Sequence, residues 1–594
     1  MSGPCGTPLR VKWILPQDRV DERRKAPSGT VDEAAGTLSK ALGLHPVAAR
    51  VLVSRGHETP ELAQRFLSDA LTDLPDPFSM KGLRAAVDRL ALAVIEHHPV
   101  TLYGDYDVDG VSSTALLTTF LGQLGLVVKT YIPHRLGEGY GLNLPAIEKI
   151  AESGARLLVT LDCGITAHAE IARAGELGLE VIVVDHHAVP ETMPPALAVL
   201  NPLQPGCDYP TKWLCAGGVT FNLCMGLRKV LRDRGYFSDK REPNLKQHLD
   251  LVALATVADV VPLTGANRIL VRHGLAELTA GRRPGVRALK AVAGVFGEVT
   301  ASHVGFRLGP RINAAGRLDD ASIGLRCLLA TDEATATPLA KALDEANAER
   351  QEIEKVILNE AVEQAGAAVG RGAKGLVLWA PTWHPGVVGI VASRVVERFY
   401  RPTILVGVHE GMGKGSARSI EGFHLYDAIK ACSGALKRFG GHKAAAGLSI
   451  DPERLPAFAA DFDKVASARL TEDDLVPRLR IDALVSPGEL DEQTYLALRA
   501  LGPFGMGNAE PLLALEGQQA APRVIDNKKE GEPGHLKLVL ESAPSLDAIG
   551  FRQAPLLSLA QGPMDLAFRL QLDEYRGVTR LGIKLTALRA STGA

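Results

Sequence analysis

The sequence predicts an α/β protein with a parallel-sheet domain, a second and smaller α/β domain, and a C-terminal β-barrel. From Pro99 onward, short β-branched runs alternate with helical segments. Strands alternating with helices of about 10–15 residues are typical of right-handed βαβ units and a parallel sheet covered by helices. After residue 474, several short runs separated by turn residues favour a small antiparallel barrel.

The spacing of apolar residues predicts the remaining elements. Residues 32–75 have a helical pattern interrupted by Gly and Pro, which predicts a small N-terminal helical cap. Residues 331–366, rich in Glu and Ala, predict one long helix that connects two lobes; a solvated surface helix is a compatible interpretation. The strands expected in the first sheet are 100–104, 126–132, 155–161 and 179–185.

The overall charge excludes a general attraction to nucleic acid. The 594 residues include 66 Lys and Arg against 68 Asp and Glu, a formal net charge of −2, so any polyanion must bind a local patch. Residues 371–445 offer such a patch, since their 11 Lys and Arg against 4 Asp and Glu give a local net charge of +7. A solvated surface is the alternative interpretation of this stretch.

The cysteines and the apolar segments indicate a cytoplasmic protein without membrane association. Seven cysteines, none of them spaced as CxxC, argue against a disulfide framework and against a structural zinc site. The N-terminus lacks the apolar stretch of a secretory signal. Val111–Val128 spans 18 residues without a charge, but its Ser, Thr, Gln and Gly residues favour a buried helix followed by a strand.

Acidic and histidine side chains follow three of the expected strands, and one more acid interrupts a later apolar run. These residues are Asp105, Asp107, Asp109, Asp162, Asp185, His186, His187 and Asp259. Because the carboxyl ends of parallel strands meet at one edge of a sheet, we expect these side chains to lie close together. Single Asp residues there are often helix N-caps, but capping explains neither the alternation of three acids nor two adjacent histidines.

Carboxylates with imidazole and without thiolate suit divalent ions such as Mn²⁺ or Mg²⁺. Two such ions, bridged by a shared carboxylate, would activate a water and stabilise the leaving oxygen in phosphoryl hydrolysis. The sequence therefore predicts a two-metal phosphoesterase.

Several motifs resemble a known superfamily. GDYDVDG, TLDCG, VVDHH and TVADVVPL are similar, in chain order, to the four metal-site motifs of the DHH phosphoesterases. PRINAAGRL, TWHPGVVGIVASRV, ARSIEGFHL, GGHKAAAG and LGPFGMGNAEP resemble the RecJ branch, and the resemblance covers about residues 40–590. It implies a single-strand-specific 5′→3′ DNA exonuclease that releases 5′-mononucleotides in DNA repair and recombination.

The resemblance also implies roles for individual residues. The metal ligands would be Asp105, Asp107, Asp162, His186 and Asp259. Asp162 is the candidate for the bridging carboxylate, while Asp185 and His187 would orient the ligands or touch the scissile phosphate; with His186 these are the expected catalytic residues. Tyr103 departs from the pattern, because some DHH proteins have a metal-binding His at this position.

A second set of residues is expected to bind DNA. The family motifs and the +7 stretch together nominate Arg311, Asn313, Arg317, His384, Ser393, Arg394, Arg418, Ser419, His442 and Lys443. The alternative for Arg311 and Arg317, in the expected PRINAAGRL loop, is salt bridging within that loop. For His384 and His442 it is a hydrogen-bonded histidine in a turn. Phe504 could stack on a base or anchor its turn, and we favour the anchor.

Three functions stay open at this point. The first is the exonuclease, and the second is a DHH hydrolase of short oligonucleotides, cyclic dinucleotides or pyrophosphate, for which the cap, the PRINAAGRL loop and the barrel are unnecessary. The third is a catalytically silent replication scaffold, against which the complete set of acids argues. The resemblance implies single-stranded DNA, a single-strand-binding protein and a RecQ-like helicase as partners, and we expect a monomer.

We expect five segments along the chain. They are an N-terminal helical region at 1–75, a DHH catalytic domain at 76–330, a connecting helix at 331–366, a DHH-associated nucleic-acid-binding domain at 367–468 and an OB-fold-like domain at 469–594.

Overall fold

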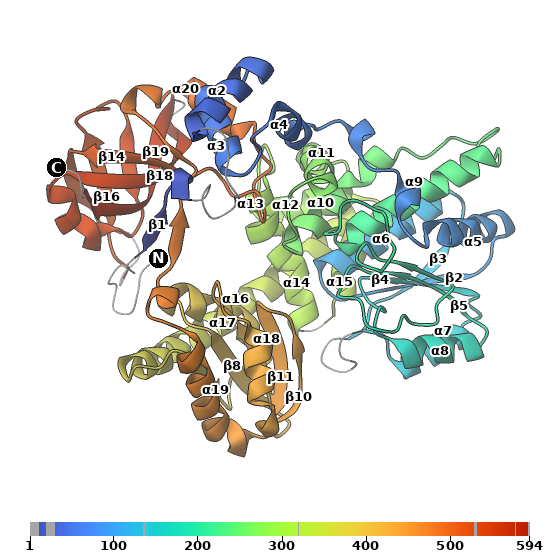
Figure 1. Cartoon of the computed structure of the whole chain (residues 1–594). Coiled ribbons are helices and arrows are strands. Elements are labelled where there is room, and N and C mark those ends of the chain that lie inside the picture. Colours follow the sequence, from blue (N-terminus) through green and yellow to red (C-terminus); the bar gives the residue numbers. More distant parts are fainter. Residues whose placement is uncertain are drawn as a thin grey trace. The chain divides into compact units, whose positions relative to one another are not determined.

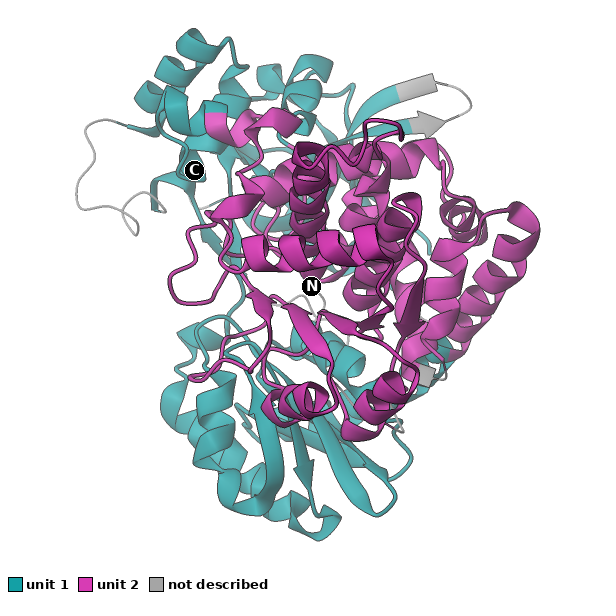
Figure 2. Ribbon diagram, turned by 90° about the vertical axis from the view of Figure 1, so that its right-hand side faces the viewer, with its two compact units in different colours: residues 1–64, 350–501, 510–594 teal, residues 65–349, 502–509 magenta. Residues whose placement is uncertain are grey.

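The computed structural model describes residues 11–18, 30–134, 138, 141–318, 320–527, 532–575 and 578–591 (Figure 1). The chain divides into two compact units, drawn in teal and magenta in Figure 2. Unit 1 comprises 1–64, 350–501 and 510–594, and unit 2 comprises 65–349 and 502–509. The expected connecting helix exists as α16 (Glu333–Gly370), and the boundary between the units falls within it.

Unit 2 contains the predicted parallel sheet, with the strand order β3-β2-β4-β5-β6. The strands are β2 (Val100–Gly104), β3 (Val128–Tyr131), β4 (Leu157–Leu161), β5 (Glu180–Val184) and β6 (Ala198–Leu200). The alternation of strand and helix predicts the first four, whereas β6 is only three residues long and has no clear pattern of its own. Because β4 pairs with both β2 and β5, the three strands that precede the acids are neighbours.

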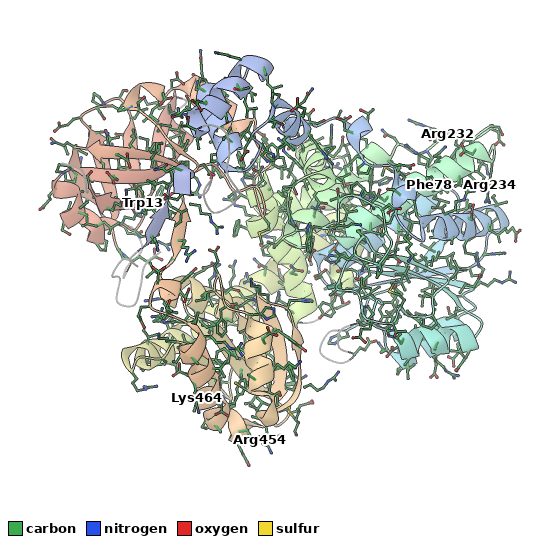
Figure 3. The ribbon with its side chains drawn as sticks, in the orientation of Figure 1. Trp13, Phe78, Arg232, Arg234, Arg454 and Lys464 are labelled. Carbon is green, nitrogen blue, oxygen red and sulfur yellow. The ribbon has the colours of Figure 1, made fainter. Side chains whose placement is uncertain are left out.

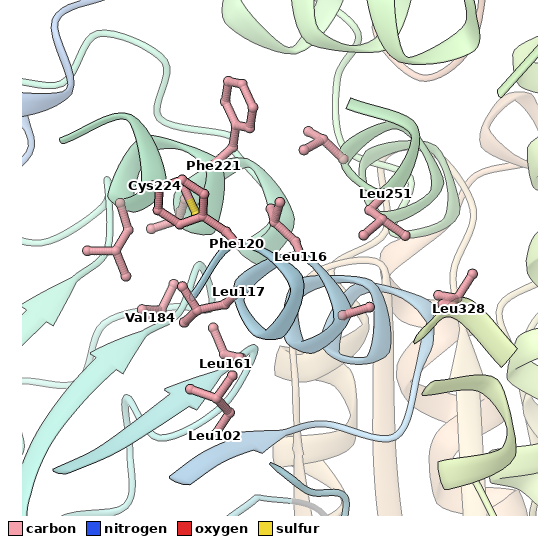
Figure 4. Packing of buried hydrophobic residues seen from close by; sticks show 14 of the residues in the cluster. Leu102, Leu116, Leu117, Phe120, Leu161, Val184, Phe221, Cys224, Leu251 and Leu328 are labelled. Carbon is pink, nitrogen blue, oxygen red and sulfur yellow. The ribbon is translucent and has the colours of Figure 1, made fainter. Parts of the chain in front are cut away.

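Helices cover both faces of this sheet. The helices of unit 2 up to residue 258 are α5 (Leu83–Glu96), α6 (Val108–Gln123), α7 (Leu144–Glu152), α8 (His168–Glu176), α9 (Ala216–Asp233) and α10 (Leu249–Ala258). On one face, Leu102 and Leu161 pack with Phe120 of α6 in the largest hydrophobic cluster (Figure 4). On the other face, Leu158 packs with Ile147 of α7. These two clusters fix the sheet edge from which the acids project.

The uncharged segment that begins at Val111 lies in α6 and β3, as predicted. Helix α6 is buried on almost every side, which explains its lack of charge. Within the described residues, no helix combines the length and the apolar character needed to cross a membrane.

The next part of unit 2, residues 266–329, is mainly helical. It contains α11 (Ala266–Ala280), α12 (Pro284–Val292), α13 (Ala301–His303), a π-helical turn (Val304–Leu308), α14 (Gly309–Leu318) and α15 (Ser322–Leu329). The PRINAAGRL motif therefore lies in a helix, α14, and our expectation of a loop was wrong. A Cβ added at Gly316 would lie 2.7 Å from the carbonyl oxygen of Tyr106, so α14 packs closely against the turn that follows β2.

Unit 1 contains a second α/β sheet with the order β10-β11-β9-β8-β7. Its elements are β7 (Leu376–Ala380), α17 (Val388–Phe399), β8 (Thr403–His409), β9 (Met412–Arg418), α18 (Leu425–Ala431), β10 (Leu436–Gly441), β11 (Ala445–Ile450) and α19 (Leu455–Arg469). Only β7 and β8 pair in parallel, so this sheet is mixed. The basic stretch at 371–445 begins just before β7 and ends at the first residue of β11.

A third sheet, also in unit 1, has the order β13-β14-β18-β19-β17-β16-β15. Its strands are β13 (Ala483–Leu484), β14 (Leu513–Gln518), β15 (Ala520–Ile525), β16 (His535–Leu540), β17 (Asp547–Gly550), β18 (Met564–Tyr575) and β19 (Val578–Ala590). The pairs β13–β14 and β17–β19 are parallel, which corrects the expectation of a purely antiparallel barrel. The short runs after residue 474 on which we base the barrel do not include residues 520–525, so the sequence did not predict strand β15.

The predicted helical cap consists of α2 (Val31–Leu42), α3 (Pro46–Ser54) and α4 (Pro60–Leu67), and the boundary between unit 1 and unit 2 falls within α4. Strand β1 (Lys12–Ile14) pairs with β12 (Arg478–Arg480), and α20 (Glu492–Arg499) follows later in the chain. The guanidinium of Arg589 lies 4.4 Å from the ring centroid of Trp13 (labelled in Figure 3). A buried ion pair of 3.0 Å joins Arg55 to Asp482. These contacts tie the N-terminal segment to the third sheet.

Candidate metal centre

The backbone places three acids at the same edge of the parallel sheet. Asp105, Asp162 and Asp185 each follow a strand, and each donates its backbone N–H to the neighbouring strand. The acceptors are the carbonyls of Leu161 at 3.1 Å, Val184 at 2.9 Å and Leu200 at 3.0 Å, respectively. The side chains therefore start from equivalent positions of adjacent strands, as the sequence predicts.

The potential ligand atoms at this edge form three overlapping groups, in each of which the atoms lie within 4.8 Å of one another. The groups are Asp105 with Asp107 and Asp162, Asp109 with His186 and Asp259, and Asp162 with His186 and His187. All five predicted metal ligands belong to them. Asp162 and His186 each belong to two groups, which gives them the central positions.

His186 presents a neutral imidazole nitrogen to the carboxylates. Its Nε2 lies 3.2 Å from Asp162 Oδ1, 3.5 Å from Asp259 Oδ2 and 3.7 Å from Asp109 Oδ2. Burial, with a smaller effect from His187, lowers the pKa of His186 to about 4. Nε2 of His186 and Oδ2 of Asp259 are buried and make no hydrogen bond within the described part of the chain. A neutral nitrogen among carboxylate oxygens is the donor set of a divalent cation site.

The carboxyl groups destabilise one another when they are ionised. Burial, and then the charges of neighbouring acids, raise the pKa of Asp109, Asp162 and Asp259. A bound cation would offset this repulsion. The nearby thiols are poor competitors for the ion, because burial raises the pKa of Cys163 and Cys215 far above its ordinary value. The residues present therefore fit Mn²⁺ or Mg²⁺ better than a thiolate-binding metal.

Asp185 orients the second histidine. Its Oδ1 accepts hydrogen bonds from the backbone N–H of His187 at 3.0 Å and from its ring Nδ1 at 2.7 Å. Burial opposes the charge of His187, but the hydrogen bond and charge of Asp185 outweigh it and raise the pKa of His187 to about 9. His187 is 38% exposed, so a positively charged ring faces the solvent beside the acid cluster.

Asp107 and Asp109 combine capping with a place in the cluster. Asp107 is the N-cap of α6, and its Oδ1 accepts from the backbone N–H of Asp109 at 2.9 Å and of Gly110 at 3.1 Å. The two carboxylate oxygens of Asp109 accept from the N–H groups of Ala216 and Gly217, each at 2.7 Å. Our predicted ligand set leaves out Asp109. The alternation with Asp105 and Asp107 was the signal that could have identified it.

Two other features distinguish this edge of the sheet. Asp162 has a φ of 66°, a left-handed conformation that is uncommon for residues other than glycine and that often marks functional sites. Tyr103 lies outside the cluster: its side chain is buried among the residues of the opposite sheet face, and its hydroxyl donates to the carbonyl of Gly141 at 2.9 Å.

Helix α14 carries three of the predicted DNA-binding residues, and one of them, Asn313, contacts the start of α6 beside the acid cluster. Asn313 Oδ1 accepts from the backbone N–H of Val108 at 3.0 Å, at the start of α6. Arg311 forms an ion pair of 2.8 Å with Asp344 of α16, so its salt bridge joins another helix and does not lie within the motif, as our alternative had it. Arg317, in the last turn of α14, is half-buried.

The remaining predicted DNA-binding residues lie in the part of unit 1 that contains the second sheet and its helices. A Cβ added at Gly389 of α17 would lie 2.8 Å from Ser416 Oγ and 3.4 Å from Arg418 Nη2. Ser393 donates its hydroxyl to the carbonyl of Gly389 at 3.4 Å. The structure thus brings the start of α17 close to Arg418.

The other predicted residues of this domain have local partners. Arg394 pairs with Glu397 at 3.2 Å, and Ser419 donates its hydroxyl to the carbonyl of Phe423 at 2.8 Å. His384 Nδ1 accepts from the N–H of Gly386 at 3.1 Å, as a turn histidine does. His442 and Lys443 are exposed. Their contacts with DNA stay predictions.

Family models match three parts of the chain. The DHH family, N-terminal domain, matches residues 99–256, the DHHA1 domain matches 372–468 and the RecJ OB domain matches 481–587. The first match covers the sheet and the acids described above, apart from Asp259. The fold is therefore the predicted one: a DHH phosphoesterase domain, a smaller α/β domain and an OB domain.

Relatives match over most of the length. The single-stranded-DNA-specific exonuclease RecJ of Escherichia coli is 38% identical over 93% of this chain and 97% of its own length. The protein of the same name from Bacillus subtilis is also 38% identical, and the chain spans 64% of its length. A crystal structure of RecJ from Thermus thermophilus in complex with Mn²⁺ superposes with a TM-score of 0.81 and 35% identity, over 98% of this chain and 80% of that one. The chain therefore belongs to the RecJ family.

Proposed function

We propose that this protein is a metal-dependent exonuclease that degrades single-stranded DNA from the 5′ end to 5′-mononucleotides, in DNA repair and recombination. The observation that carries the proposal is the cluster of acids around the neutral imidazole of His186. The full-length similarity to single-stranded-DNA-specific exonucleases supports the substrate. Neither a small-substrate hydrolase nor a silent scaffold is favoured, because the chain keeps both the OB domain and the complete acid set.

The proposed metal ligands are Asp105, Asp107, Asp162, His186 and Asp259, and we add Asp109 to this set. Asp162 is the proposed bridging ligand, since it belongs to two of the three groups. Two bound Mn²⁺ or Mg²⁺ ions would supply an activated water and stabilise the leaving oxygen.

His187 and Asp185 are proposed to orient the phosphate of the substrate and to balance its negative charge. The charged ring of His187, held by Asp185, is proposed to donate to a phosphate oxygen of the substrate. Asp185 accepts three hydrogen bonds at Oδ1, from the backbone and ring nitrogens of the two histidines, and a fourth at Oδ2 from the backbone N–H of Ile165. Because both of its oxygens are occupied, we assign it to holding His187 and not to binding an ion.

The DNA backbone is proposed to follow the basic stretch at 371–445. Arg418 supports this part of the proposal, because its guanidinium donates to two neutral acceptors, Ser416 Oγ at 3.1 Å and the carbonyl of Ala417 at 2.8 Å. A guanidinium held in place by neutral acceptors keeps its charge available for a phosphate.

We further propose that the protein is a cytoplasmic monomer that works with a single-strand-binding protein and a RecQ-like helicase, as the resemblance implies. Six described cysteines are buried free thiols, which agrees with a reducing compartment. The domain boundaries given above stay part of the proposal.

The test is the release of mononucleotides with Mn²⁺ from single-stranded DNA labelled at the 5′ end, compared with 3′-labelled and duplex DNA. Preferential early release of the 5′ label from the single strand is the expected result. Activity on cyclic dinucleotides but not on DNA would favour the small-substrate hydrolase, and DNA binding without hydrolysis would favour the scaffold.

A further inference from the structure

Three exposed apolar side chains lie on segments next to the metal centre and are not used by the proposed mechanism. Trp213 is 60% exposed, Val260 is 60% exposed and Met506 is 56% exposed. All three belong to unit 2, although Met506 comes from the GPFGMGN turn, whose flanking residues belong to unit 1. We call these three residues the apolar shelf.

Hydrogen bonds join the three segments that carry the shelf. The side-chain amide of Asn267, which is fully buried, donates to the carbonyl of Trp213 at 2.6 Å and to that of Pro262 at 3.0 Å. The backbone N–H of Leu263 donates to the carbonyl of Met506 at 2.8 Å. The shelf is therefore built on fixed backbone and not on independent loops.

The GPFGMGN turn fits closely against the segment that follows Asp259. A Cβ added at Gly505 would lie 2.8 Å from Leu263 Cδ1, and one added at Gly507 would lie 2.9 Å from Pro262 Cβ. Gly505 and Asn508 pair across the turn, so Met506 and Gly507 form its tip. Phe504 is half-buried, whereas the side chain of Met506 is exposed.

Val260 is held in a strained conformation. Its φ is 58°, in the left-handed region that β-branched residues rarely adopt. Such strain persists only where the surroundings enforce it, and it is concentrated at functional sites. Here its effect is to expose an apolar side chain directly after Asp259.

The shelf begins close to the acids. Val260 follows Asp259 in the chain, and Trp213 is three residues before Ala216, whose N–H donates to Asp109 at 2.7 Å. Three extended residues span at most about 11 Å. A nucleotide whose phosphate reaches the acid cluster therefore has its base within reach of the shelf.

We propose that the apolar shelf receives an unpaired nucleobase of the DNA strand next to the scissile phosphate, with Trp213 as the stacking residue. This inference rests on the proposed function. A base offers an apolar face whatever its identity, so the contact binds any sequence. In a duplex the same base is paired and stacked on its neighbours, so the shelf favours single strands.

The experiment compares variants with substrates that lack a base. Trp213→Ala is expected to lower kcat/KM for 5′-phosphorylated oligothymidylate about tenfold, which equals about 1.4 kcal/mol and lies in the range of base stacking. An abasic residue at one position near the 5′ end should cause a similar loss in the wild type and little further loss in the variant. Trp213→Phe should retain most of the activity. Phe296→Ala, which removes an aromatic ring that is 81% exposed elsewhere in unit 2, is the matched control.

Hydrolysis of bis(p-nitrophenyl) phosphate with Mn²⁺ reports on the metal centre alone, and Trp213→Ala should leave it unchanged. An equal loss on this small diester would assign Trp213 to the support of the metal site and overturn the proposal. Additive losses of activity from Trp213→Ala and from the abasic residue would also overturn the proposal. Full activity of the variant on DNA would overturn it too, and is the result expected if the shelf binds a protein.

Tryptophan fluorescence tests the shelf independently of the proposed function, because it reports binding and not hydrolysis. Trp13 and Trp383 are buried and Trp379 is half-buried, so Trp213 dominates quenching by a ligand. Oligothymidylate should quench wild-type fluorescence in EDTA more strongly than an oligomer with abasic residues at its 5′ end. Quenching without hydrolysis would contradict the exonuclease but keep the shelf, and hydrolysis without quenching would contradict the shelf alone.

Discussion

Replacing Asp109 tests whether this acid holds the start of α9 as well as contributing to the metal centre. Asp109→Asn and Asp109→Ala both remove the buried charge, and they differ in the acceptors that they keep. Asn retains one oxygen for the N–H groups of Ala216 and Gly217, whereas Ala retains none. A buried N–H without an acceptor costs about 1–3 kcal/mol. We therefore expect the Ala variant to be less stable than the Asn variant by about that amount.

Hydrogen exchange measures this difference where it arises. A local loss of about 1–3 kcal/mol corresponds to about 5–150-fold faster exchange of the affected amide. The amides of Ala216 and Gly217 should exchange faster by this factor in Asp109→Ala than in Asp109→Asn, while the middle of α9 stays protected. Asp88→Asn is the control, because Asp88 forms surface ion pairs with Arg84 and Arg234 and should change exchange at α9 very little. Equal exchange in both Asp109 variants would refute the reasoning.

Four further predictions follow from the site. Asp162→Ala should lower the rate of DNA hydrolysis at least about 10³-fold, through the loss of several kcal/mol of metal-ion stabilisation. DNA binding measured by gel shift should persist. Substantial residual hydrolysis would contradict the assignment of Asp162 as a metal ligand. In EDTA, thermal stability should fall between about pH 7 and pH 9. The reason is that the pKa values of Asp162, Asp259 and His187 are raised, so the folded state binds more protons than the unfolded state. Mn²⁺ should flatten this pH profile, and a stability that rises with pH would contradict the prediction. Gly316→Ala should slow hydrolysis, because the added methyl would clash with the carbonyl oxygen of Tyr106 and push α14 away from it, at a cost of about 1–3 kcal/mol. Gly366→Ala, whose methyl meets nothing within 4 Å, should leave the rate unchanged. Tyr103→Phe should lose about 0.5–1.5 kcal/mol of stability with its hydrogen bond to Gly141 and keep its Mn²⁺ affinity in calorimetry.

The sequence is informative where one residue type recurs at a regular place in the fold. Strands β2, β4 and β5 were predictable because their β-branched runs alternate with helices, and that order requires Asp105, Asp162 and Asp185 to meet at one edge. The short strand β6 and the strand β15 were not predictable, since neither has a distinctive run. The helical form of PRINAAGRL was also missed, because its Pro and Gly residues suggest a turn, yet its Gly316 is needed where α14 approaches Tyr106.

The clustering of the acids and histidines was predictable from the sequence, and the contacts that support the cluster were less so. The partners of Asp109 are N–H groups more than a hundred residues later in the chain, and no local sequence pattern predicts a contact at that separation. The apolar shelf has the same origin, since the hydrogen bonds of Asn267 and Leu263 join the segments that carry Trp213, Val260 and Met506. Tertiary contacts of this kind leave no motif in the sequence.

The capping and metal-binding interpretations of the strand-ending acids do not exclude each other. Asp107 caps α6 through Oδ1, and a carboxylate has a second oxygen for a cation. Asp109 accepts two N–H bonds at the start of α9, where the helix dipole favours negative charge, and it still lies within ligand distance of His186 and Asp259. Helix starts therefore help to keep these acids ionised in a buried cluster whose mutual repulsion raises their pKa values. Because that help comes from backbone groups, it persists when the ions leave, and it holds the site ready to bind them again.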